Sequence, residues 1–200
     1  MMFPAKPIPG QTPLDDLSGL RVSSIRTMAD LNAAEAENIR RATVKYLAGV
    51  PTRRSAPFDV RWMRALHAQM FGDVWTWAGR LRAHETNVGS VPRSIEIDLN
   101  NLVLDLFAWE QSSMRLLEQA VRLHHVAVRI HPFANGNGRW SRMLGNIWLK
   151  QHGSKPIAWP ETVIGTASTI RDEYLAAVRI ADGGDVGPLM AIHERYADVR

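Results

Sequence analysis

Apolar residues recur at the spacing of an α-helix along most of this chain. Thr27 followed by Asp30 has the pattern of a capping box, so we expect a helix from 29 to about 47 that ends before Pro51. The same spacing predicts further helices over 58–71, around 99–107, over 161–181 and over 186–197. Most of the chain is therefore expected to be helical.

Two central helices stand out from the others. Apolar positions from 116 to 130 fall on nearly every side of a helix, which is typical of a helix buried in a domain, and a second is predicted over 138–151. Between 84 and 97, Gly89 and Pro92 interrupt the helical period and favour a short hairpin or extended loop. We predict an all-α helical bundle with one small β-hairpin.

Length and composition set the domain organisation. A chain of 200 residues with 46% hydrophobic content suits one globular domain, expected over 27–200 after an extended, proline-rich segment over 1–26. The absence of cysteine, of a signal peptide and of an apolar run of about 18 residues favours a cytoplasmic protein without membrane contact. The net charge of +4 comes from scattered Lys and Arg, which does not favour nucleic-acid binding.

The stretch HPFANGNGRWSR, at 131–142, has the composition of an anion-binding turn. Pro132 interrupts the preceding helix, and Gly136 and Gly138 allow backbone torsions that turn successive N–H groups toward one point. The next helix would add its free N–H groups and the positive end of its dipole. This turn is therefore a candidate phosphate site.

Two arginines follow the same turn, and a histidine precedes it. Arg139 and Arg142 follow it three residues apart, so both guanidiniums could clamp the oxygens of a polyphosphate. His131 precedes the turn and can accept a proton near neutral pH, which suits a general base.

The same residues resemble the Fic family motif H-x-F-x-[D/E]-G-N-G-R-x-x-R. Those that fill it in register are His131, Phe133, Gly136, Asn137, Gly138, Arg139 and Arg142. The resemblance implies a Fic-like fold over about 27–197 and transfer of AMP from ATP to a Ser, Thr or Tyr hydroxyl of a target protein. His131 would be the catalytic base, and the other six would form the ATP-binding set, with Phe133 anchoring the loop in the core.

Asn135 departs from the motif, because the family has an acid at this position that binds Mg²⁺ on the ATP phosphates. A neutral amide oxygen is a weaker ligand for a hard cation that dehydrates reluctantly. We therefore keep Mg²⁺ as the expected cofactor and Asn135 as its expected ligand, with slower turnover or altered metal preference.

The run AAEAENIRR resembles a degenerate form of the inhibitory helix of Fic proteins, with Ala33 in place of its hydroxyl residue. The resemblance implies that Glu37 reaches Arg142 and takes the place of the γ-phosphate. The alternative is that Glu37 is an exposed helix carboxylate that pairs with Arg40 or Arg41.

The resemblance also indicates binding partners. Asn146 and Tyr174 are candidates for an adenine pocket, although each could equally be structural. The hairpin around 84–97 would hold the target protein by strand addition. The segments TPLDD and DLNAAEAENI, with the Asn variant of the motif, resemble the bacterial "mobile mystery protein B" branch, which implies a helix-turn-helix partner protein and a toxin–antitoxin setting.

Two other functions stay open at this point. A metal-dependent phosphohydrolase could use His124, His125 and His131, although their spacing is not that of a zinc site. The second open function is a catalytically weak or silent nucleotide-binding module, because Asn135 replaces the acid of the family motif.

Overall fold

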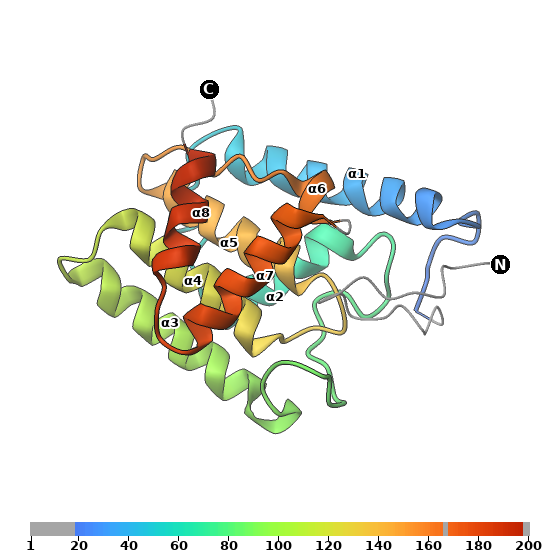
Figure 1. The fold of residues 1–200 in the computed structure, drawn as a ribbon. Coiled ribbons are helices and arrows are strands. Elements are labelled where there is room, and N and C mark those ends of the chain that lie inside the picture. Colours follow the sequence, from blue (N-terminus) through green and yellow to red (C-terminus); the bar gives the residue numbers. More distant parts are fainter. Residues whose placement is uncertain (1–18, 166–167, 198–200) are drawn as a thin grey trace.

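The computed structural model describes residues 19–165 and 168–197, which form the helical bundle drawn in Figure 1. Its elements in chain order are α1 (Met28–Leu47), α2 (Val60–Phe71), the short 3-10 helix η1 (Pro92–Ser94), α3 (Ile95–Gln111), α4 (Leu116–Ile130), α5 (Asn137–Gln151), α6 (Glu161–Ile164), α7 (Thr169–Asp182) and α8 (Gly187–Ala197). The prediction of an all-α bundle is confirmed.

The pair α4 and α5 forms the centre of the bundle, as expected from its apolar pattern. α4 packs on α5, α3 and α8, while α1 packs on α2 and also reaches α5. In Figure 1, α1 and α3 lie on opposite sides of this pair, and α7 and α8 lie beside each other over α4. The turn between the two central helices is thereby held from several sides.

Capping residues explain where the outer helices begin. Thr27 and Asp30 form the predicted capping box of α1, in which each side chain accepts the other's backbone N–H. α2 begins at Val60, two residues after the predicted start, with Asp59 as its cap, and Phe58 has a left-handed backbone with φ 57°. The predicted helix over 161–181 is divided into α6 and α7, and Ser168 caps α7.

The predicted hairpin is wrong for the described residues, in which the only β-pairing is one isolated bridge between Leu20 and Trp75. Residues 80–94 form an irregular loop that ends in η1. The guanidinium of Arg82, which is 5% exposed, donates to the carbonyls of His84, Ser90 and His131. These carbonyls are satisfied by a side chain, so the loop does not need strand pairing.

Two sequence expectations concern the chain as a whole. Most of the extended segment predicted over 1–26 lies outside the described residues, which begin at 19. Among the helices that the structure describes, none combines the length and apolar character needed to cross a bilayer.

Candidate active site

The turn between α4 and α5 is built by its own side chains. His131 ends α4 in the left-handed conformation with φ 52°, and Gly136 begins α5 with φ 78°. The side chain of Asn137 accepts the N–H of Phe133 and donates to its carbonyl, both at 2.9 Å. No side chain caps Gly136, so the N-terminus of α5 keeps its first N–H groups available for an anion.

His67 of α2 contacts this turn and holds it in place. Its Nε2 lies 3.0 Å from the carbonyl oxygen of Asn135, and its Nδ1 accepts the N–H of Gly79 at 3.0 Å. Burial lowers the pKa of His67 to about 3, so the ring is neutral and Nε2 carries the hydrogen. The ring also stacks on Phe133, with 3.7 Å between centroids, which fixes the turn on α2.

His131 is half-buried where the loop over 80–94 meets the turn. A Cβ atom at Gly89, where φ is +103°, would lie 2.6 Å from the Cβ of His131, so the loop backbone passes directly over this residue. Burial, and then the charge of Arg82, lower the pKa of His131 to about 4. The imidazole is therefore neutral at pH 7 and can accept a proton.

Arg139 is bound to α1. Its Nη1 lies 2.6 Å from a carboxylate oxygen of Glu35, whose other oxygen accepts the indole N–H of Trp75 at 2.7 Å. The Glu35 side chain is 8% exposed, whereas that of Arg139 is 33% exposed. The guanidinium also lies over the ring of Phe71, 4.8 Å from its centroid.

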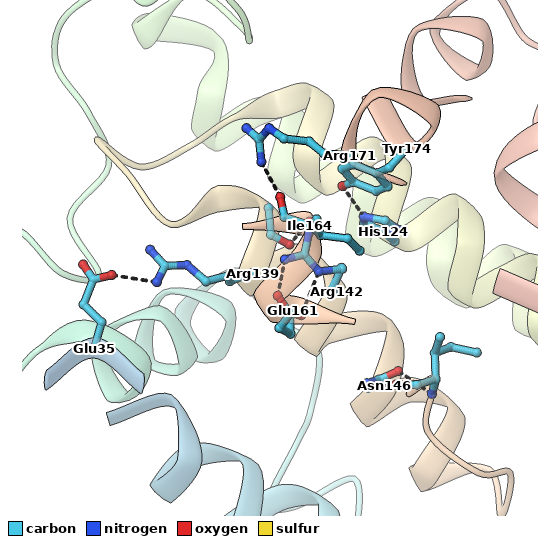
Figure 2. A network of polar contacts seen from close by, with 12 residues as sticks. Glu35, His124, Arg139, Arg142, Asn146, Glu161, Ile164, Arg171 and Tyr174 are labelled. Carbon is cyan, nitrogen blue, oxygen red and sulfur yellow. Dashed lines mark hydrogen bonds and ion pairs between the residues drawn. The ribbon is translucent and has the colours of Figure 1, made fainter. Parts of the chain in front are cut away.

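Arg142 is bound to α6. Its Nε and Nη2 donate to the two carboxylate oxygens of Glu161 at 2.9 and 2.5 Å, a bidentate pair that Figure 2 shows. Here the arginine side chain is 5% exposed and the glutamate 48%. The guanidinium centre lies 5.6 Å from the ring centroid of Tyr174.

Several predicted site residues have structural partners. Asn146 donates to the carbonyl of Ile157 and accepts its N–H, so it attaches the following connection to α5, and its place in an adenine pocket stays a prediction. Tyr174 is 5% exposed and its hydroxyl lies 2.9 Å from Nε2 of His124. Asn135 lies at the surface of the turn, where its Oδ1 accepts the N–H of Gly136 at 2.6 Å.

Glu37 does not make the expected contact with Arg142. It is exposed and pairs with Arg40 at 2.8 Å and with Arg41 at 3.8 Å, as in the alternative interpretation. Residues two apart on a helix point to nearly opposite faces, so the face of α1 that meets α5 carries Glu35 instead.

Sequence reasoning missed Glu35, Glu161, Arg82 and His67. For Glu35 a usable pattern existed, because Leu31, Glu35, Ala42 and Tyr46 share one face of α1 and all are buried. A carboxylate within such an apolar stripe requires a partner. The phosphohydrolase alternative would require a cluster of metal ligands. Among the described residues, no three His, Asp or Glu side chains gather around a possible metal.

Residues 57–149 match the Fic/DOC family. Protein adenylyltransferase fic-1 from Caenorhabditis briggsae is 30% identical over 126 residues, which cover 60% of this chain and 23% of that protein. The aligned part thus represents about a quarter of the length of this curated relative.

Solved structures show the same fold. Fic-1 from C. elegans aligns with a TM-score of 0.67 at 21% identity, covering 90% of this chain and 52% of that one. The N-terminal Fic domain of a Bep effector protein from Bartonella quintana, solved with bound ADP, aligns with a TM-score of 0.64 at 20% identity over 87% of each chain. The fold and the motif turn define a Fic-type helical domain.

Proposed function

We propose that this protein transfers AMP from ATP to a Ser, Thr or Tyr hydroxyl of a target protein. The observation that carries the proposal is the motif turn, in which a neutral imidazole ends α4, the uncapped start of α5 follows, and the two motif arginines extend from the first turns of α5. The corresponding activity appears in the names of the curated relatives, protein adenylyltransferase fic-1 among them.

The reaction needs a base and a set of fixed positive groups. His131 takes the proton of the target hydroxyl, the hydroxyl oxygen bonds to the α-phosphorus, and the bond from this phosphorus to the β-phosphate bridging oxygen breaks, releasing pyrophosphate. The N–H groups at the start of α5, with Arg139 and Arg142, stabilise the charge on the phosphates. Bound polyphosphate also raises the pKa of His131, which makes it a stronger base in the complex.

We assign Mg²⁺ to the side of the turn that carries Asn135. The amide Oδ1 is a hard oxygen with one hydrogen bond, from Gly136, so it fits one ligand position of a Mg²⁺ ion that the ATP phosphates hold for the most part. When bound, the cation would neutralise phosphate charge. The protein supplies no carboxylate at this position.

The target protein would dock along the loop over 80–94. This loop crosses directly over His131, and its Val88 and Val91 are 52% and 44% exposed. A peptide lying against these apolar side chains would bring a hydroxyl to the imidazole. The helix-turn-helix partner stays a prediction from the sequence resemblance alone.

Repression by α1 is also proposed, with Glu35 in the place first given to Glu37. Glu35 neutralises Arg139 and holds it toward α1, so the guanidinium is withheld from ATP phosphates. The glutamine of Glu35→Gln would keep an oxygen for the Trp75 N–H and lose the charge, so we expect transfer to rise about tenfold or more. Glu37→Gln is the matched control on the same helix, and its rate should stay within about twofold of the wild type.

The decisive assay incubates the full chain with cell extract and ATP labelled at the α-phosphate. Label on protein that disappears in His131→Ala supports adenylyl transfer. Labelled free AMP or ADP without labelled protein, or free phosphate from γ-labelled ATP, indicates hydrolysis and refutes the proposal, as does bound ATP that stays unchanged. Equal labelling by Glu35→Gln and the wild type would refute repression and leave the transfer activity intact.

A further inference from the structure

A row of buried polar side chains leads from α8 to Arg142. Nδ1 of His193 lies 2.8 Å from the carbonyl oxygen of Leu189, and its Nε2 lies 3.1 Å from Nδ1 of His124. Nε2 of His124 in turn lies 2.9 Å from the hydroxyl of Tyr174, a contact visible in Figure 2. The three side chains come from α8, α4 and α7, and none is more than 5% exposed.

The hydrogens in this row have only one consistent order. A carbonyl oxygen can only accept, so His193 donates from Nδ1 and, being neutral, accepts at Nε2. His124 must then donate from Nδ1 and accept the hydroxyl hydrogen of Tyr174 at Nε2. Burial lowers the pKa of His193 to about 4 and that of His124 further below its usual value, which agrees with two neutral rings.

This order determines what Tyr174 presents to Arg142. Because the hydroxyl hydrogen points to His124, the lone pairs of the oxygen are left for the guanidinium, whose centre lies 5.6 Å from the ring centroid of Tyr174 and whose pKa the tyrosine helps to raise. Burial also raises the pKa of Tyr174, so the hydroxyl stays protonated and neutral. The row therefore holds the guanidinium without neutralising its charge.

The only carboxylate paired with Arg142 among the described residues is that of Glu161, which is 48% exposed. An arriving phosphate can replace this carboxylate, whereas the neutral row behind the guanidinium stays in place. We propose that Tyr174, His124 and His193 are positioning residues that keep the Arg142 guanidinium aimed at a phosphate group of the nucleotide. This inference rests on the proposed adenylyl transfer and assigns a role that the motif itself does not contain.

The test measures ATP affinity and adenylyl transfer separately in the full chain. Tyr174→Phe removes the acceptor with almost no change of shape, and we expect about a tenfold loss of kcat/KM. His124→Gln should give a loss of similar size. The matched control is His125→Gln, because His125 is the next residue of α4, is 4% exposed and pairs with Asp182 instead, at 2.8 Å. Its activity should stay within about twofold of the wild type.

A double-mutant cycle separates positioning from general structural damage. In an Arg142→Lys background the fork geometry is already lost, so Tyr174→Phe should cost less than about twofold there. An equal loss in both backgrounds, or no loss in either, overturns the proposal. If the wild type transfers no label, the proposed function fails, and the same cycle measured on ATP affinity still decides whether Tyr174 acts through Arg142.

Discussion

The two motif arginines are neutralised in opposite ways. At Arg139 the carboxylate is the buried and fixed partner, because Glu35 is 8% exposed and accepts from Trp75, while the guanidinium is one-third exposed. At Arg142 the guanidinium is buried against Tyr174, and the carboxylate of Glu161 is half-exposed. Figure 2 shows the two side chains extending from α5 toward different neighbours.

This difference indicates which group moves when an anion arrives. Water already solvates part of Arg139, but if its guanidinium left Glu35 the buried carboxylate would have no cation, so the pair resists separation. Arg142 also keeps its buried position, but Glu161 can turn into solvent. At Arg142 the guanidinium is thus already in place for a phosphate, and only the carboxylate of Glu161 has to move. At Arg139 the guanidinium itself is held away from the phosphate by Glu35.

The largest expected effect is the loss of activity in Arg142→Met. Removing a fixed donor for a developing charge costs roughly 100-fold to 1000-fold in rate, and we expect a loss of kcat/KM in that range. Stability should change little, because Met fills the apolar part of the space and the half-exposed Glu161 becomes hydrated. Labelling kinetics and thermal unfolding of the same preparation measure both quantities.

The comparison predicts the reverse pattern for Arg139→Met. This change leaves the buried carboxylate of Glu35 without its cation, so the free energy of unfolding should fall by roughly 2 kcal/mol. Activity should fall only about tenfold, because a partly exposed donor contributes less. If both variants lost activity and stability to the same extent, the distinction between the two sides would be wrong.

The next effect concerns nucleotide affinity. Glu161→Gln removes the carboxylate that competes for Arg142, so we expect ATP to bind about three to ten times more tightly, from a difference of roughly 1 kcal/mol. Titration calorimetry with the Mg²⁺ complex of ATP measures this directly. Glu173→Gln is the control, since Glu173 pairs with Arg195 at 2.7 Å at similar exposure. Unchanged affinity in Glu161→Gln would show that Glu161 does not compete with ATP.

How far the sequence predicted this site depends on the kind of interaction. The helices and the turn are local features, so periodicity, caps and two glycines were sufficient to predict the bundle and the turn between α4 and α5. The carboxylates were missed because ion pairing depends on packing. Glu35 and Arg139 are 104 residues apart, and Glu161 and Arg142 are 19 apart.

The hairpin was mispredicted for a related reason. Gly89 and Pro92 correctly indicated a break in helical structure, but they do not reveal how the loop satisfies its backbone groups. The buried guanidinium of Arg82 accomplishes this for the carbonyls of His84 and Ser90, and its bond to the distant carbonyl of His131 depends on packing that no local pattern contains. The motif position indicates Glu37, whereas the buried face of α1 contains Glu35.

A smaller effect is the pH dependence of stability. His67 and His193, beside the turn and behind Arg142 respectively, have pKa values lowered to about 3 and about 4 by burial. The unfolded chain takes up protons below about pH 6.5 that the folded chain does not bind, so stability falls as the pH falls toward 4. Each such histidine contributes at most about 1.4 kcal/mol per pH unit in this window.

Urea unfolding measured between pH 7 and pH 4.5 gives the number of protons taken up. That number should decrease by about one in His67→Gln and in His193→Gln. The control is Asn87→Gln on the exposed part of the loop, which removes no titratable group and should not change it. Uptake that stays the same in the first two variants would mean that these rings are not neutral in the folded protein.

The smallest expected effect is that of Asn135→Asp, which restores the acid of the family motif. The new carboxylate can still accept the N–H of Gly136, so the turn should keep its shape, and the added charge makes a stronger ligand for Mg²⁺. We expect the Mg²⁺ concentration for half-maximal labelling to decrease by a few fold and turnover to rise by about the same factor. The gain should be larger in a Glu35→Gln background, where Arg139 is free to bind phosphate. Equal Mg²⁺ dependence and equal rates in all four proteins would mean that position 135 does not contact the cation, and that the metal, if used, is held by the nucleotide alone.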